Sequence, residues 1–334
     1  ADAFVYSMVK GMPNHALKVI NVTKTISNGN AASTVFEVVK AGILKKMWLK
    51  CVVTGVGLSA VHTDSLLNVH NSISLANNNR VIEYLHPMSM RAHINKMPER
   101  ERIAVNAALC ATAGNPVANT GFTAYVPLPF SFSRDNNPEK FLDTNYLDNM
   151  TLTLDQRAMS TVMTIGTSIT SVAWTLYAEY VVMEDSAYEV YKSRQFNGKP
   201  LEYLFTNSFQ ENDKNTSNAQ VSNTIDLTCD NVITKTRLRL LDNGTHNPYP
   251  ISQVALKGSI SSITLRGNGE NLWEADAVQI QSANMQLTTV AAVDGNVFNG
   301  EIEIDWTVMP FVKEADSFNG GLSLRNIAGP QLII

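Results

Sequence analysis

The chain has 334 residues, 44% of them hydrophobic, which is enough for two domains that each bury a core. Its net charge of −4 excludes the strongly basic surface that attracts nucleic acid, so no specific nucleic-acid partner is expected. The three cysteines, Cys51, Cys110 and Cys229, lack CxxC spacing, and we expect no disulfide framework, metal or cofactor. This usage suits assembly in a reducing cytoplasm.

The first thirty residues alternate only weakly before they turn polar, and we expect an N-terminal arm of low regularity at 1–30. The start lacks both a signal-peptide layout and an initiator Met, which indicates processing or truncation at that end. From residue 31, alternating apolar and polar residues predict half-buried strands. The first four are expected at 34–39, 47–53, 66–75 and 81–85.

Residues 86–118 interrupt the strand pattern. Apolar residues near helical spacing lie between Pro98 and Gly114, which predicts one short helix inside a long connection. Long connections in compact domains usually carry contacts, so we expect this one to pack against another subunit or to form a tower on the outer surface. Further strands are expected at 122–126, 150–154, 162–165 and 172–183.

The strand pattern breaks after residue 183, where a helical turn or two is expected, and a polar linker follows over 191–222. The predicted domains are therefore a first unit at 31–190 and a second at 223–334. Many short strands, little helix and frequent turn residues indicate an all-β sandwich or barrel.

An internal repeat relates the two units. SISLANNNRVIE at 72–83 returns as SITLRGNGENLWE at 262–274, 190 positions later. Because further matches keep the same order and all have strand patterns, a duplicated β unit is the best explanation. Their offsets are 189, 181 and 180, for 34–53 with 223–242, 124–130 with 305–311, and 141–154 with 321–334.

The alignment leaves the second unit short at its C-terminal end. At least two more strands are expected after Leu154 in the first unit, whereas the equivalent position in the second is Ile334. A barrel without those strands would expose unpaired backbone groups and an uncovered core. Three explanations stay open: the chain continues beyond residue 334, an arm such as 1–30 of the same or a neighbouring chain supplies the strands, or the register of 321–334 is wrong.

Five stretches in order carry a family resemblance: AGILKKMWLKCVV, VPLPFSFSRDNNPEKFLDTNYLDNMTLTL, AWTLYAEYVVMEDSAYEVY, RLRLLDNG and FNGGLSLRNIAGPQLII. Together with the duplication, this set resembles the double jelly-roll major capsid proteins of tailless icosahedral viruses and bacteriophages. Many of these viruses contain an internal membrane, and the lineage is related to the adenovirus hexon. The resemblance covers about 34–334, nearly the whole chain.

The resemblance implies an all-β fold of two tandem eight-stranded jelly-roll barrels with a few short helices in loops. It implies a non-enzymatic virion protein, assembled in the host cytoplasm, whose homotrimers form pseudo-hexameric capsomers of an icosahedral capsid. The implied partners are neighbouring capsomers, penton or spike proteins, minor capsid proteins and, where a membrane lies beneath the shell, its lipid headgroups. The alternative from another class is a jelly-roll spike or adhesin that binds a receptor or a carbohydrate.

The sequence contains few candidates for catalysis or ligand binding. GVGLSA at 55–60 has dinucleotide-binding spacing, but neither a helix nor an acid about 20 residues on follows it, so a flexible inter-strand loop is favoured. The histidines His62, His70, His86 and His93 match no metal-ligand spacing and are expected on the surface or in the core.

Carboxylates on a β scaffold can hydrolyse glycosides when two of them stand at a suitable separation. Strand-end or turn positions explain the acids of this chain equally well, and no GxSxG elbow is present, so no catalytic residues are expected. The acids concerned are Asp143, Asp148, Asp155, Glu179, Glu184 and Asp185.

Two basic clusters, Lys45-Lys46-Lys50 and Lys235-Arg237-Arg239, occupy equivalent strands. Alternate residues of a strand share one face, so each cluster predicts a charged face. This face is either solvated or between subunits, or it contacts acidic neighbours or lipid headgroups at the capsid floor.

Overall fold

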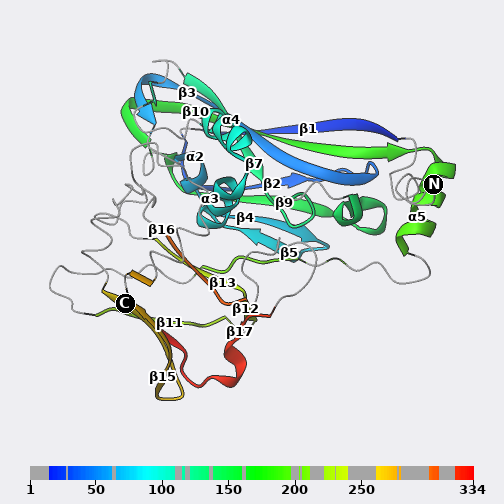
Figure 1. The fold of residues 1–334 in the computed structure, drawn as a ribbon. Coiled ribbons are helices and arrows are strands. Elements are labelled where there is room, and N and C mark those ends of the chain that lie inside the picture. Colours follow the sequence, from blue (N-terminus) through cyan, green and yellow to red (C-terminus); the bar gives the residue numbers. More distant parts are fainter. Residues whose placement is uncertain are drawn as a thin grey trace.

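The computed structural model describes two β units, the first built from strands β1 to β10 and the second from β11 to β18 (Figure 1). The described residues are 15–27, 29–61, 65–109, 115–116, 121–134, 138–159, 163–196, 203, 205–210, 222–229, 231–239, 261–276, 278–279, 301–307 and 320–334.

The first unit consists of two antiparallel sheets. Sheet A contains β1 (His15–Ser27), β10 (Met163–Met183) and β3 (Ile43–Val61) in that order, with β6 (Asn115–Pro116), β7 (Gly121–Leu128) and β8 (Leu142–Asp143) along the other edge of β3. Sheet B has the order β2 (Ala32–Glu37), β9 (Met150–Gln156), β4 (His70–Asn77) and β5 (Arg80–Leu85). Because the chain alternates between the two sheets, the unit is a jelly roll.

One continuous hydrophobic core fills the space between sheets A and B. Alternate residues of β2, β7 and β9 point into it, as the alternation in the sequence predicts. Phe36, Leu49, Leu152 and Trp174 are fully buried there. The indole of Trp174 donates a hydrogen bond of 2.6 Å to Gln156 Oε1, so this large side chain is buried with its polar atom satisfied.

The second unit repeats most of this arrangement. Sheet C has the order β11 (Thr224–Asp226), β18 (Gln331–Ile333), β14 (Ser262–Gly267) and β15 (Glu270–Asp276), which corresponds to sheet B. The pairs β12 (Val232–Ile233) with β17 (Leu322–Ser323), and β13 (Lys235–Arg239) with β16 (Glu301–Asp305), correspond to β3 with β8 and β7.

Strand register confirms the predicted repeat. Leu75 pairs with Leu152 in the first unit, and Leu265 pairs with Leu332 in the second, 190 and 180 positions later. Each hairpin has a register shift directly after this leucine. In both turns two successive residues have positive φ, Asn78 and Asn79 in the first unit and Asn268 and Gly269 in the second. This is the geometry of a type I′ turn.

The predicted register of 321–334 is also confirmed. The backbone amide of Asn78 donates to the carbonyl of Asp148 at 3.2 Å, and that of Asn268 donates to the carbonyl of Ala328, 180 positions after Asp148, at 2.9 Å. A short 3-10 turn precedes this loop in both units, η2 (Thr144–Tyr146) and η4 (Leu324–Asn326). Of the three explanations left open by the sequence, a wrong register of 321–334 is therefore excluded.

The match of 124–130 with 305–311 is wrong in the strands. Leu49 pairs with Val126, whereas its equivalent Leu238 pairs with Ile302, 176 positions after Val126 rather than 181. The alignment was based on the Pro-Phe pair that occurs at both 129–130 and 310–311. The register of the strands is instead set by their pairing with the neighbouring strand.

The expected low regularity of 1–30 is wrong for His15–Ser27, which form the 13-residue strand β1. All thirteen residues pair with β10, so this part of the chain completes the first unit and does not supply a strand to the second. The two strands expected at 162–165 and 172–183 are one strand, β10, which keeps its pairing with β3 through several register shifts. The start of the strand expected at 66–75 is instead the short helix α2 (Ser65–Asn68).

The described part of the connection at 86–118 contains two helices, α3 (Pro87–Lys96) and α4 (Glu99–Ala108), where one was expected. Pro98 separates them, and Arg91 of α3 donates to Asn106 of α4 at 2.7 Å. The short helix η1 (Pro138–Lys140) precedes β8. The helix α5 (Asp185–Phe196) follows β10 and is longer than the turn or two expected there.

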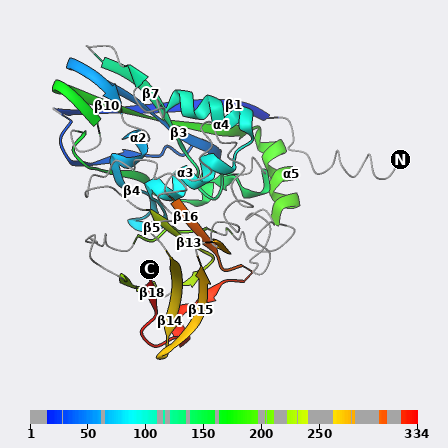
Figure 2. The same cartoon turned by 60° about the vertical axis from the view of Figure 1, so that its left-hand side comes forward.

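Figures 1 and 2 show the sheets as successive layers. Sheet A lies at one end, followed by sheet B with α3, then the layer of β13 and β16, and then sheet C. The two units are therefore stacked with sheet B of the first toward the β13–β16 layer of the second.

Equivalent core leucines allow the two units to be compared. We expect Leu75→Ala and Leu265→Ala each to lower the free energy of unfolding by about 2–5 kcal/mol, because both side chains are buried and leave a cavity. Differential scanning calorimetry should show each variant shifting the transition of its own unit. The exposed Val56→Ala serves as the control, and a loss equal to that of the leucine variants would contradict this account of the core.

Candidate functional site: the interface between the two units

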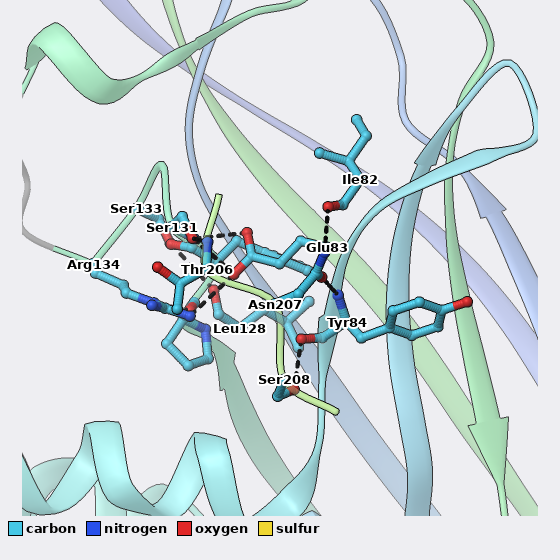
Figure 3. A network of polar contacts seen from close by, with 12 residues as sticks. Ile82, Glu83, Tyr84, Leu128, Ser131, Ser133, Arg134, Thr206, Asn207 and Ser208 are labelled. Carbon is cyan, nitrogen blue, oxygen red and sulfur yellow. Dashed lines mark hydrogen bonds and ion pairs between the residues drawn. The ribbon is translucent and has the colours of Figure 1, made fainter. Parts of the chain in front are cut away.

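A buried carboxylate holds the first unit to the segment that leads toward the second (Figure 3). Glu83 of β5 is fully buried and accepts hydrogen bonds from the backbone amide of Ser131 at 2.9 Å and from its hydroxyl at 3.0 Å. Arg134 lies on its other side, with Nη2 3.0 Å from Glu83 Oε1. The Arg134 Nε donates to the carbonyl of Pro129 at 2.8 Å, which fixes the guanidinium in place.

The pKa of the Glu83 carboxyl depends on burial and on its contacts with Arg134 and Ser131, which act in opposite directions. Burial raises the pKa of the Glu83 carboxyl to about 7, while the charge of Arg134 and the hydrogen bonds from Ser131 act to lower it. A buried charge with one removed partner is strongly destabilising, so Glu83 and Arg134 depend on each other.

The linker segment joins this network through Ser131. The backbone amide of Thr206 donates to the Ser131 hydroxyl at 2.9 Å, so one hydroxyl contacts both Glu83 and the linker. The next residue, Asn207, accepts from the amide of Tyr84 at 2.7 Å and donates to the carbonyl of Ile82 at 3.2 Å. Its side chain therefore occupies the place of a neighbouring strand along the open edge of β5 (Figure 3).

Two further contacts bind the start of the linker to the first unit. The hydroxyl of Tyr188, on α5, donates to the buried carboxylate of Asp143 at 2.5 Å. The hydroxyl of Tyr203 accepts from the backbone amide of Asp143 at 2.8 Å. Together with Thr206 and Asn207, these residues place the chain between the units against the first unit rather than in solvent.

The outer face of β13 and β16 carries the second predicted basic cluster. Ile302 and Ile304 point into the second unit, so the alternate residues Glu303 and Asp305 point away from it, toward the first unit. Glu303 accepts from Arg237 Nε at 2.8 Å and lies 3.8 Å from Lys235 Nζ.

A charged contact joins the two units at this face. Lys96, at the end of α3, lies with Nζ 3.2 Å from Glu303 Oε1. Although burial acts to raise the pKa of the Glu303 carboxyl, the charges of Arg237, Lys96 and Lys235 outweigh it and lower the pKa. The helix α3 therefore connects the two units of one chain, a role not foreseen for the excursion at 86–118.

The first basic cluster also has a carboxylate partner, although on a strand that is not the counterpart of β16. Lys45 and Lys46 contact the two oxygens of Glu179 at 2.9 and 3.0 Å. Burial alone would raise the pKa of Glu179, but the two lysines lower it. In both units, acidic neighbours on the adjacent strand thus contact the cluster.

The remaining sequence candidates have structural positions. Residues 55–60 belong to β3, so the expected flexible loop is wrong, and the helix that follows, α2, has only four residues. His70 is buried in the core, His86 Nδ1 lies 2.8 Å from Ser208 Oγ, His93 is on α3, and His62 lies outside the described residues. No group of three potential metal-ligand residues occurs in the described part of the chain.

The candidate carboxylates have separate partners. Asp143 binds Tyr188, Asp148 contacts Lys40, and Asp155 accepts from Asn71 at 3.1 Å. Glu184 and Asp185 are exposed where α5 begins. Among the helices of the described ranges, none is long and apolar enough to cross a membrane.

Glu83, Ser131, Arg134 and Asn207 were not predicted from the sequence as site residues. One signal was available: Glu83 occupies a position of strand 81–85 whose alternation with Leu85 directs it into the core. A charged residue at an inward position requires buried partners, but the sequence does not say which.

His70 should make the first unit sensitive to acid. Its ring lies 4.9 Å from that of Trp174, both of its nitrogens lack hydrogen-bond partners, and burial lowers its pKa to about 3. The unfolded state therefore binds more protons between pH 6.5 and pH 3, and stability is lost as the pH falls through this window. We expect His70 to contribute a loss of about 2 kcal/mol from pH 7 to pH 5, which urea unfolding gives as the difference between the wild type and His70→Phe. The raised pKa of Glu83 acts in the opposite direction over this pH range, but it is common to both proteins and cancels in the difference. Equal pH dependence of the two proteins would contradict the assignment.

Ser131→Ala should release the linker. The change removes the acceptor of the Thr206 amide and one donor to Glu83, so we expect a loss of about 1–3 kcal/mol. Hydrogen–deuterium exchange should accelerate at Thr206 by about tenfold or more, since 1.4 kcal/mol is one factor of ten. Ser193→Ala, which removes an exposed hydroxyl bond within α5, is the matched control. Unchanged exchange at Thr206 would show that Ser131 does not hold the linker.

Comparisons with known proteins agree with this architecture. No family model and no curated protein sequence matches the chain. PBCV-1 VP54, whose crystal structure was fitted into a reconstruction of the virophage Sputnik, matches with a TM-score of 0.71 at 14% identity over 96% of this chain and 84% of that one.

Two further solved structures cover similar shares. The Faustovirus major capsid protein matches with a TM-score of 0.57 at 9% identity, over 96% of this chain and 87% of that one. The major capsid protein of the Sulfolobus Turreted Icosahedral Virus matches with a TM-score of 0.54 at 10% identity, over 95% of this chain and 94% of that one. The chain therefore has the double jelly-roll fold of these viral proteins.

Proposed function

We propose that the chain is a major capsid protein, and that three copies form a pseudo-hexameric capsomer of an icosahedral capsid. The observation that carries this proposal is the stack of two equivalent jelly rolls in one chain, shared over nearly its whole length with the viral capsid proteins described above. Three such chains present six similar barrels, which suits a near-hexagonal lattice. The role is structural, without catalysis.

The domains and partners follow from this function. We keep 31–190, 191–222 and 223–334 as first barrel, linker and second barrel, with β1 of the 1–30 segment added to the first barrel. The partners are neighbouring capsomers, penton or spike proteins, minor capsid proteins and the lipid headgroups of an underlying membrane, within a virion. The alternative, a receptor- or carbohydrate-binding spike, has less support because the structures of like fold are capsid proteins.

Assembly of the purified chain tests this function. We expect native mass spectrometry at micromolar concentration to give a homotrimer, because obligate interfaces commonly bury more than about 2,000 Å². Negative-stain images should show particles of hexagonal outline. A stable monomer that binds glycans on an array would contradict the capsid function and favour the spike.

A further inference from the structure

We propose that the outer face of sheet A in one copy binds the outer face of sheet C in the next copy, head to tail. This inference rests on the proposed function and names the surfaces that hold the trimer together. The sheet A face consists of Lys46, Trp48, Lys50, Tyr125 and Tyr177, and the sheet C face of Asp226, Arg266, Glu274 and Asp276.

Both faces lie at the ends of the stack. In Figures 1 and 2, sheet A forms one outer layer and sheet C the other, with sheet B and the β13–β16 layer between them. The two end faces differ, so a contact between them is heterologous, and repetition of that contact closes a ring or extends a filament.

The contact within one chain provides the template. Sheet B of the first barrel faces the β13–β16 layer of the second, which is the counterpart of sheet A, and Lys96 contacts Glu303 there. Sheet C is the counterpart of sheet B. If the same relation recurs between chains, sheet C of one copy faces sheet A of the next.

The sheet A face is basic and aromatic. Lys46, Trp48 and Lys50 alternate along β3 with the buried Met47, Leu49 and Cys51, so they point outward. Trp48 stacks on Tyr177 of β10 with ring centroids 5.4 Å apart, and Lys46 Nζ lies 5.6 Å from the centroid of Trp48.

Lysines outnumber carboxylates on this face. Glu179 accepts from Lys45 and contacts Lys46, and its single negative charge does not balance these two lysines and Lys50 together. Lys50 lies beside the exposed Tyr125, its pairing partner on β7. A basic face with exposed aromatic rings is uncommon on a chain of net charge −4 and suits an acidic partner surface.

The sheet C face has the opposite charge. Ile263, Leu265 and Ala275 point into the core of the second barrel, so the alternate residues of β14 and β15 point outward. Glu274 and Asp276 are exposed at outward positions of β15, and Asp226 is exposed on β11. Arg266 is the only base among the described outward residues of sheet C, so the face is acidic. Complementary charge therefore orients one copy on the next.

Charge reversal tests the contact. Lys50→Glu with Thr123→Glu makes the sheet A face acidic, and Asp226→Lys with Glu274→Lys makes the sheet C face basic; all four positions are outward and at least partly exposed. We expect each double variant to raise the trimer dissociation constant by about tenfold or more, and the four changes together to restore assembly. Glu37→Lys with Glu184→Lys, exposed elsewhere, is the matched control and should assemble like wild type.

Native mass spectrometry as a function of concentration gives the readout, and circular dichroism confirms that each variant is folded. Trimers that are unaffected by either double variant would overturn the face assignment and leave the capsid function standing. A loss of assembly in each double variant without rescue in the quadruple variant would also overturn it, because the two faces would then not meet. A wild-type monomer would overturn the proposed function and this interface with it.

Discussion

The register between β4 and β9, and its repeat between β14 and β18, decides which side chains each barrel buries and which it presents. Leu75 and Leu152 face each other in the first core, and a slip by one residue would turn both outward. Burial of one leucine contributes about 1.5–3 kcal/mol, and each strand carries several apolar residues in phase. In the same way, the register between β13 and β16 places Lys235 and Glu303 on the outer face where the units meet.

The parts of the fold that local chemistry specifies could be predicted from the sequence. The hairpin turns at Asn78 and Asn268 need residues that adopt positive φ, and the sequence supplies Asn-Asn in the first unit and Asn-Gly in the second. The repeat offsets of 190 and 180 were right in the strands next to these turns, and the offset of 189 was right for β12. The offset of 181 was wrong because β16 takes its register from β13, and no local signal records that pairing.

Long-range contacts explain most of what the sequence did not predict. The strand β1 lies at the edge of sheet A, and its outward residues Leu17 and Val19 are about half exposed, so its alternation is weak. Its partner β10 is far away along the chain. Likewise, the role of Glu83 at the linker depends on Ser131, which binds it, and on Thr206, which binds Ser131. Both residues are distant from Glu83 along the chain.

The two barrels differ where they make different kinds of contact. Strand register makes Arg237 the counterpart of Trp48, since Trp48 pairs with Pro127 and Arg237 with Glu303, 176 positions after Pro127. The outer face of β13 meets the first barrel of its own chain, where covalent linkage gives a high effective concentration, and ion pairs such as Arg237 with Glu303 are sufficient. A contact between separate chains lacks that advantage and has to overcome the entropy of association. Aromatic anchors contribute most to such contacts, and Trp48 stacked on Tyr177 supplies one at the end of the stack where a second copy would bind.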